Sequence, residues 1–353
     1  DRVVTPLNAC SLETYVPMIS DDDGDKAALP LVIGCYQLNE QSDGNKEESA
    51  NNNDDGDEPK SSSRSGELRL YMINKQADRY EPVEDVVQME SGVLDGKWRR
   101  RYIKVNCQST STLNNSSSYT TIPLFASACA SGRVHLHSLM KANNQWNLSH
   151  VTSSNEPTEE GLCLSLAWND FVDAASQDTD QIVSSYSNGT VALHKVFGNI
   201  NNNNAISIEE THRWNAHTLF GCPSEVWTCS FLKGDANVVL SGADDVTLKV
   251  WDIRQTQKHI QKVGESEFEA GVTAISPHPK LDHVFAVGSY DEYVRVYDYR
   301  KMNEPLVKCH VGGGVWRIKW HPSNWHDGGS SSHDCVGKML IASMHGGCRV
   351  VDV

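Results

Sequence analysis

Two neighbouring stretches, SGADDVTLKVWDIR (241–254) and GSYDEYVRVYDYR (288–300), decide how this chain folds. The second repeats the first at an offset of 46 residues, counted from Gly242 to Gly288. The positions that recur are a glycine, a turn aspartate, a valine, an aromatic–aspartate pair and an arginine: Gly242, Asp245, Val250, Trp251, Asp252 and Arg254, matched by Gly288, Asp291, Val296, Tyr297, Asp298 and Arg300. Self-similarity at this period predicts an array of small, similar structural units.

Each copy is typical of two strands joined by a tight turn. VVLSGA (238–243) is an apolar strand, Asp244-Asp245 forms the turn, and TLKVWDI (247–253) is the next strand. A sheet this small cannot bury both faces alone, so it must stack on its neighbours. The period is close to the ~40–45 residues of a WD40 repeat, which forms one propeller blade. We expect the turn aspartate to accept hydrogen bonds from groups near the start of its blade, which is a structural role.

Six such units can be placed along the chain, and they predict an all-β WD40 propeller with one domain over residues 1–353. Residues 39–66 are rich in Asn, Asp, Glu and Ser, and we expect a disordered acidic insertion within the first blade. The sixth unit ends on its third strand, so the chain forms a six-bladed ring or lacks a C-terminal blade. VVTPL (3–7) is the candidate strand for closing the ring.

The formal net charge of −15 disfavours binding to phosphate backbones and anionic lipids. The basic stretch KWRRR (97–101) is too short to reverse this, and we expect a solvated strand edge or loop there. No run of 18 apolar residues occurs. We therefore expect a monomer that binds neither nucleic acid nor a membrane.

The ten cysteines are scattered, without a Cys-x-x-Cys pair. Cys163, Cys229 and Cys348 fall within apolar strands, where a free thiol behaves as a small hydrophobic group. This pattern favours reduced thiols and a cytoplasmic protein.

Common catalytic and nucleotide-binding signatures are missing from the sequence, which has no Gly-x-Ser-x-Gly, Walker or Rossmann glycine pattern. His135 and His137 lie on one strand and face the same side, but a third metal ligand is not evident. We expect two surface histidines, no metal site and no cofactor.

The mouth of a propeller channel is formed by the residues before each turn aspartate and those that open each first strand. Here these are Glu225, Trp227, Asp244, Tyr290, Trp316 and His345. Two Trp, one Tyr and two acids suit a cationic or peptide group, which makes Glu225, Trp227, Tyr290 and Trp316 the candidate binding residues. His345 with Asp244 could also activate a water molecule. The same rim could serve only to dock a protein, as most propeller rims do.

Several motifs together resemble one family. They are GVWRIKWHP (314–322), GSYDE (288–292) and MHGG (344–347), supported by GCYQL (34–38), LSLAW (164–168), SSYSNG (184–189), WNAH (214–217) and SGADD (241–245). These motifs are similar to those of the diphthine methyl ester hydrolases, the WD-repeat proteins of diphthamide biosynthesis. The resemblance implies a seven-bladed propeller that hydrolyses the methyl ester of methylated diphthine on translation elongation factor 2, giving diphthine and methanol. It assigns no nucleophile.

Two other classes of function stay open. The first is a non-catalytic scaffold, which the lack of a recognised nucleophile favours. The second is a ubiquitin-ligase substrate adaptor, suggested by Asp252-x-Arg254 and Asp298-x-Arg300. Those arginines could equally brace adjacent strands.

Overall fold

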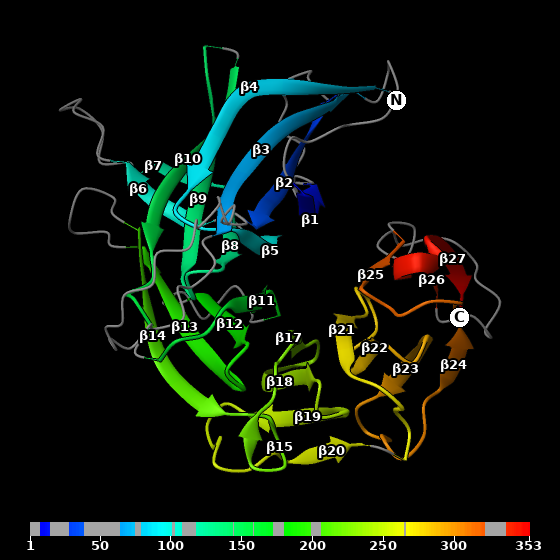
Figure 1. Cartoon of the computed structure of the whole chain (residues 1–353). Helices are drawn as coiled ribbons and strands as arrows, with labels where there is room; N and C mark the ends of the chain where they lie inside the picture. Colours follow the sequence, from blue (N-terminus) through cyan, green and yellow to red (C-terminus); the bar gives the residue numbers. More distant parts are fainter. Residues whose placement is uncertain are drawn as a thin grey trace, which may run out of the picture.

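The computed structural model describes residues 8–14, 28–38, 64–74, 79–100, 103–107, 118–143, 145–157, 159–171, 180–198, 206–264, 266–321 and 337–353. Six antiparallel sheets follow one another along the chain and are arranged in an arc around a common centre (Figure 1). This confirms the predicted all-β propeller with six recognisable blades.

The first three blades each contain four strands. Blade 1 consists of β1 (Asn8–Thr14), β2 (Ala28–Leu38), β3 (Arg64–Asn74) and β4 (Arg79–Met89). Blade 2 consists of β5 (Val93–Trp98), β8 (Leu124–Cys129), β9 (Val134–Ala142) and β10 (Gln145–Ser153). Blade 3 consists of β11 (Cys163–Trp168), β12 (Asp180–Tyr186), β13 (Thr190–Gly198) and β14 (Ile206–Asn215).

In each of the six blades the strands are given from the innermost to the outermost, and the last three blades are as follows. Blade 4 consists of β17 (Thr228–Leu232), β18 (Asp235–Ala243), β19 (Thr247–Asp252) and β20 (Gln261–Val263). Blade 5 consists of β21 (Val272–Pro277), β22 (Val284–Ser289), β23 (Tyr293–Asp298) and β24 (Val307–His310). Blade 6 has three strands among the described residues, β25 (Arg317–Trp320), β26 (Lys338–Ala342) and β27 (Cys348–Asp352). Two hairpins lie outside the blades, β6 (Ile103–Cys107) with β7 (Ser118–Ile122) and β15 (Thr218–Leu219) with β16 (Cys222–Pro223).

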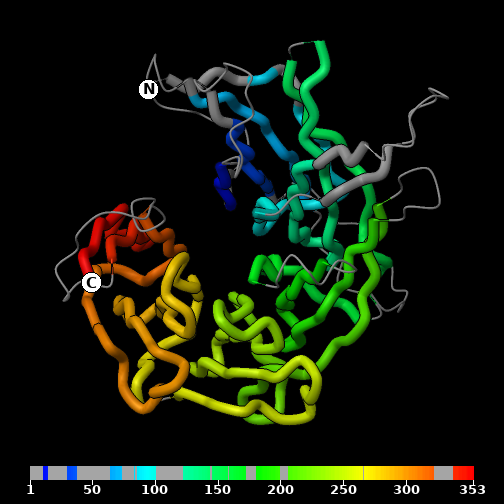
Figure 2. The backbone as a smooth tube through the Cα atoms, turned by 180° about the vertical axis from the view of Figure 1, so that it is seen from behind, coloured from blue at the N-terminus to red at the C-terminus, as the bar shows by residue number. Residues whose placement is uncertain are grey.

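The arc is open between blades 1 and 6, which lie on the same side of the molecule in both backbone views (Figure 2). Their inner strands still meet, because Lys319 Nζ of β25 lies 2.5 Å from Glu13 Oε1 of β1. The predicted closing strand, residues 3–7, lies outside the described residues. Of the predicted insertion at 39–66, residues 39–63 also lie outside them. Residues 64–66 belong to strand β3, so the insertion was predicted three residues too long.

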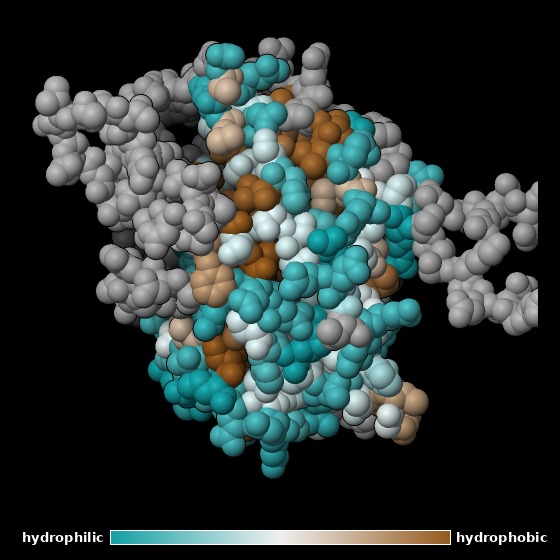
Figure 3. Space-filling model, turned by 90° about the vertical axis from the view of Figure 1, so that its left-hand side faces the viewer, coloured by the Kyte–Doolittle hydropathy of each residue, from teal (hydrophilic) through white to brown (hydrophobic). Residues whose placement is uncertain are grey.

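The core is built from apolar layers, each between two successive blades. Between blades 3 and 4, for example, Phe231 and Trp251 share a cluster with Val191 and Trp214. Similar clusters lie between blades 1 and 2, 2 and 3, 4 and 5, and 5 and 6. Fully burying one large apolar side chain contributes roughly 1.5–3 kcal/mol, so stacking supplies what a single blade lacks. The outer face around β10 and β14 is mostly hydrophilic, with small separate apolar patches (Figure 3).

The glycines that reveal the repeat are required by the contact between blades. A Cβ atom on Gly242 would lie 2.4 Å from Val272 Cγ1, at the start of the next inner strand. A Cβ atom on Gly288 would lie 2.2 Å from Val315 Cγ1 in the following unit. Only glycine allows the backbones of neighbouring blades to approach this closely.

The turn aspartates have the structural role that the sequence predicts. Asp245 accepts a hydrogen bond from Thr247 Oγ1 at 2.6 Å, and His217 Nδ1, from the segment before blade 4, lies 2.9 Å from its carboxylate. His217 Nε2 lies 2.7 Å from Ser241 Oγ, which also accepts a hydrogen bond from the Trp251 indole at 2.8 Å. Burial alone would raise the pKa of Asp245, but the hydrogen bond and charge of His217 outweigh this and lower the pKa to about 2. Asp245 therefore fixes the geometry of the blade.

Candidate functional site

Five of the predicted residues of the mouth lie together at blades 4, 5 and 6, and we call them the rim: Glu225, Trp227, Asp244, Tyr290 and Trp316. The rings of Trp227 and Trp316, each just before an inner strand, have centroids 5.9 Å apart. The Trp227 indole donates a hydrogen bond to Asp244 Oδ1 at 2.8 Å. The backbone N–H of Asp244 donates to the carbonyl of Glu225 at 3.1 Å. The rim thus combines an aromatic pair with two carboxylates.

Two neighbouring carboxylates, Asp244 and Glu225, make this part of the rim acidic. Partial burial and the nearby charge of Asp244 raise the pKa of Glu225. Burial and the charges of Asp244 and Glu225 also raise the pKa of Tyr290. Both shifts report that added negative charge is unfavourable here, and a bound cation would relieve that repulsion.

The described contacts of His345 include no rim residue, and its carboxylate neighbour differs from the one predicted. It belongs to the short 3-10 helix Met344–Gly346, and its side chain is 74% exposed. Its Nε2 lies 3.8 Å from Glu292 Oε1, while the other Glu292 oxygen lies 2.9 Å from His310 Nε2. Within the described ranges, no hydrogen bond or ion pair joins His345 to Asp244. Asp244 instead holds the Trp227 indole in place.

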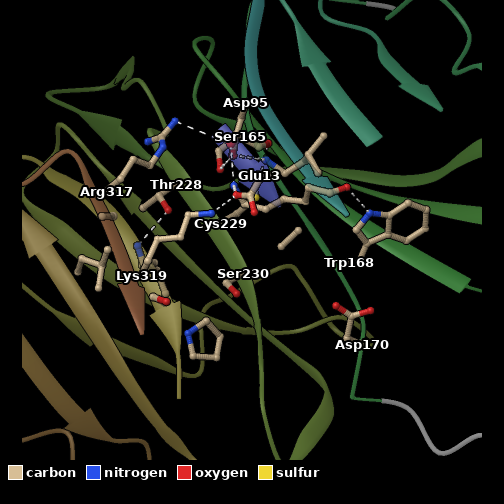
Figure 4. A pocket seen from close by; sticks show the side chains of 18 of the residues that line it. Glu13, Asp95, Ser165, Trp168, Asp170, Thr228, Cys229, Ser230, Arg317 and Lys319 are labelled. Atoms are coloured by element: carbon tan, nitrogen blue, oxygen red, sulfur yellow. Dashed lines mark hydrogen bonds and ion pairs between the residues drawn. The ribbon is translucent and has the colours of Figure 1, made fainter. Parts of the chain in front are cut away.

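Below the rim, the inner strands enclose a cavity of about 210 Å³ whose lining includes charged side chains (Figure 4). Arg317 and Lys319 extend from β25 on one side toward Asp95 of β5 and Glu13 of β1 on the other (Figure 4). Lys97 Nζ lies 2.7 Å from Asp95 Oδ1 and 3.2 Å from Glu13 Oε1. Together these side chains form what we call the channel cluster: Glu13, Asp95, Lys97, Arg317 and Lys319.

Asp95 is the centre of the channel cluster. Its carboxylate accepts hydrogen bonds from the hydroxyl of Ser165 at 2.8 Å and from the backbone N–H of Gly96 at 2.9 Å. Burial alone would raise its pKa, but the charges of Lys97 and Arg317 and hydrogen bonds from Lys97 and Ser165 lower it to about 2. Asp95 is therefore a permanent anion at neutral pH.

Sequence reasoning missed the channel cluster. The available signal was a pair of charged residues within each of two inner strands, DGK (95–97) and RIK (317–319), where most inner strands are apolar. KWRRR (97–101) was instead predicted to be a solvated edge or loop. That prediction was wrong for Lys97, which lines the cavity, and for Arg99, whose side chain is 8% exposed and pairs with Asp180. Residue 101 lies outside the described residues.

The two predicted surface histidines are also buried, so that prediction was wrong. His135 and His137 lie on β9 with ring centroids 6.5 Å apart, and β10 adds His150, whose ring centroid is 5.5 Å from that of His137. Burial lowers the pKa of His137 to about 3, because an imidazolium ion is poorly solvated there. The described residues contain no group of His, Cys, Asp or Glu that could hold a metal ion.

Among the described side chains, six cysteines form no disulfide: Cys129, Cys163, Cys222, Cys229, Cys309 and Cys348. Cys163 and Cys229 are buried as predicted, whereas Cys348 is exposed on β27. In the described part of the chain, no helix is both long and apolar enough to span a bilayer.

The two arginines of the Asp-x-Arg pattern do not brace adjacent strands. Arg254 pairs with Asp252, and Arg300 pairs with Asp298, two residues earlier in the same turn. Their side chains are 67% and 65% exposed.

Comparison with known proteins agrees with this fold. Residues 260–298 match the WD40 family, described as a WD domain or G-beta repeat. The chain is 28% identical over 274 residues to the "Diphthine methyltransferase homolog" of Dictyostelium discoideum, covering 75% of this chain and 62% of the relative. It is 31% identical over 324 residues to the "Diphthine methyltransferase" of Homo sapiens, covering 91% of this chain and 62% of the relative. The "Diphthine methyltransferase" of Mus musculus is 31% identical over 306 residues, covering 84% of this chain and 54% of the relative.

The matched segment therefore spans about 62% of the first two relatives. Their names refer to methyl transfer, whereas the motifs resemble those of ester hydrolases. What the fold and the comparisons establish together is a WD40-repeat β-propeller that is similar over most of its length to proteins named diphthine methyltransferase.

Proposed function

We propose that this propeller belongs to a protein of diphthamide biosynthesis and hydrolyses the methyl ester of methylated diphthine on translation elongation factor 2. The products would be diphthine and methanol. The relatives named diphthine methyltransferase support the pathway. The motif resemblance supports hydrolysis as the reaction.

The observation that carries the proposal is the rim. The resemblance implies a substrate that carries a trimethylammonium group. Such a group cannot donate ordinary hydrogen bonds, so aromatic faces and nearby carboxylates are what can recognise it. Trp227 and Trp316 supply the faces, and Asp244 and Glu225 supply the negative charge. Glu225 and Asp244 are exposed, so a group carried on the surface of another protein can reach them.

His345 is the proposed general base, oriented by Glu292 rather than by Asp244. The imidazole takes a proton from water while the hydroxyl oxygen bonds to the ester carbonyl carbon. The tetrahedral intermediate then collapses, the bond to the methoxy oxygen breaks, and the imidazolium returns its proton to give methanol. The product carboxylic acid ionises. No cofactor takes part in these steps, and the cytoplasmic location and monomeric state remain predictions.

Methyl transfer is the second candidate, because the names of the relatives favour it. It needs a methyl donor, and the sequence carries no Rossmann glycine pattern to hold a nucleotide. A transferase would add a methyl mass to elongation factor 2 only in the presence of S-adenosylmethionine. A hydrolase would remove one methyl-ester mass without it.

The test is mass spectrometry of methyl-esterified elongation factor 2 after incubation with the protein, together with measurement of methanol. Loss of the ester with release of methanol supports hydrolysis. An unchanged mass of elongation factor 2, together with stable co-elution of the two proteins, would instead support a non-catalytic scaffold. His345→Ala and Asp244→Ala are expected to slow methanol release, with His259→Ala, outside the rim, as the matched control. Wild-type rates in both His345→Ala and Asp244→Ala would refute the assignment of these residues.

A further inference from the structure

Arg317 connects the rim to the channel cluster. It is the first residue of β25 and follows Trp316 directly. Its guanidinium carbon lies 5.1 Å from the ring centroid of Trp316. Its Nη2 lies 4.0 Å from Asp95 Oδ1, beyond hydrogen-bonding distance. The guanidinium thus lies between the aromatic pair and the buried carboxylate of the cavity.

The channel cluster carries one more positive than negative charge. Its three cations, Lys97, Arg317 and Lys319, face two carboxylates, Glu13 and Asp95. The other charged lining residues, Arg100 and Asp170, are one of each sign. The cavity as a whole is therefore suited to a monoanionic group.

The excess charge falls on Arg317, because the other groups satisfy one another. Asp95 already binds Lys97, Ser165 and two backbone N–H groups, those of Gly96 and Leu166. Glu13 already binds both lysines. Among the described residues, Arg317 makes one hydrogen bond, from Nη1 to the carbonyl of Trp316 at 3.1 Å.

A guanidinium with unused N–H groups at the wall of a cavity is suited to a carboxylate, which it can bind with two parallel hydrogen bonds. The rim directly above attracts a cation. The two subsites share Trp316, whose ring lies 5.1 Å from the Arg317 guanidinium and 5.9 Å from the ring of Trp227. They can therefore be reached by one small group that carries both charges close together.

We propose that the rim and Arg317 form a single site for a betaine-type group, in which a quaternary ammonium and a carboxylate lie on the same carbon or on neighbouring carbons. The ammonium lies against Trp227 and Trp316, and the carboxylate lies on Arg317. The inference rests on the proposed function for the nature of the ligand. It adds that Arg317 distinguishes a free carboxylate from its methyl ester, so that the hydrolysed form binds more tightly.

The test uses three probes on the whole chain: glycine betaine, its methyl ester and tetramethylammonium. Binding is followed by tryptophan fluorescence, since two tryptophans line the site. Glycine betaine should bind about tenfold or more tightly than the other two, as hydrogen bonds to charged groups contribute roughly 1.5–3 kcal/mol. Arg317→Gln should remove this preference and leave tetramethylammonium affinity unchanged. Arg317→Lys keeps the charge but loses the two parallel N–H donors of the guanidinium. Its preference for glycine betaine should lie between those of the wild-type protein and Arg317→Gln.

Arg254→Gln is the matched control, because Arg254 is exposed and pairs only within its own turn. Circular dichroism and thermal unfolding check that each variant is folded. Equal affinity of the wild-type protein for the three probes would overturn the inference, as would an equal loss for all probes in Arg317→Lys. Methanol release is measured separately. Hydrolysis without a preference for betaine refutes only the carboxylate site, whereas a preference without hydrolysis refutes only the proposed reaction.

Discussion

Replacing Asp95 by asparagine removes the central anion of the channel cluster while keeping the size of the side chain. The side chain of Asp95 is 2% exposed, and Lys97 and Ser165 depend on its negative charge. Its pKa is lowered from 3.8 to about 2 in the folded protein. At ~1.4 kcal/mol per pKa unit, the ionised form contributes about 2.5 kcal/mol to stability at neutral pH. Asp95→Asn should lower the free energy of unfolding by about this amount.

The pH dependence of the free energy of unfolding tests independently whether ionised Asp95 stabilises the protein. Because the folded pKa lies below the unfolded value, the stabilisation is complete above pH ~4 and is lost as the pH falls toward 2. Urea unfolding of both proteins should therefore show a constant difference between pH 7 and 5, and a smaller one at pH 3.5. The control is Asp252→Asn, which breaks an exposed ion pair and should leave the midpoint unchanged. Equal stability of Asp95→Asn and wild type at pH 7 would refute the reasoning, as would a difference that grows on acidification.

Three further predictions follow from the packing and the rim. Gly288→Ala should destabilise the protein by roughly 1–3 kcal/mol, because the new methyl group meets Val315. The control is Gly264→Ala, whose new methyl group would have its nearest contact 3.5 Å away and should not destabilise the protein. Equal unfolding midpoints for the two variants would contradict the prediction. His217→Ala should cost roughly 1–3 kcal/mol by chemical denaturation, since it removes a buried partner of both Asp245 and Ser241; an unchanged midpoint would show that the network contributes little. Tetramethylammonium affinity should fall as the pH decreases through the pKa of Glu225, which is raised above 4.5. Glu225→Gln should flatten this pH profile. A profile unaffected by the substitution would show that the Glu225 carboxylate does not attract the cation.

The sequence predicts the fold well because the repeat carries its own physical cause. Gly242 and Gly288 recur since each must admit a valine of the next unit, and Asp245 and Asp291 recur since each closes a turn. These constraints act within one unit or between adjacent units. They therefore leave a mark at a fixed spacing along the chain.

Part of the site follows from the same regularity. Positions next to each turn and each first strand must lie at the mouth, so Trp227, Asp244 and Trp316 are predicted together and are found together. His345 faces Glu292 instead of Asp244, because which acid it meets depends on the path of the helix Met344–Gly346. No repeat rule specifies that path.

The sequence by itself determined the number of units, the turn residues and the aromatic, acidic character of the mouth, because each follows from local spacing. Only the tertiary structure decided that Glu13, Asp95 and Arg317 meet in one cavity, although they come from three different blades. Each lies on a different inner strand, and the excess positive charge becomes apparent only when the inner strands converge on the centre and their charges can be counted together. That convergence brings residues from opposite ends of the chain into contact, and no pattern in neighbouring residues records it.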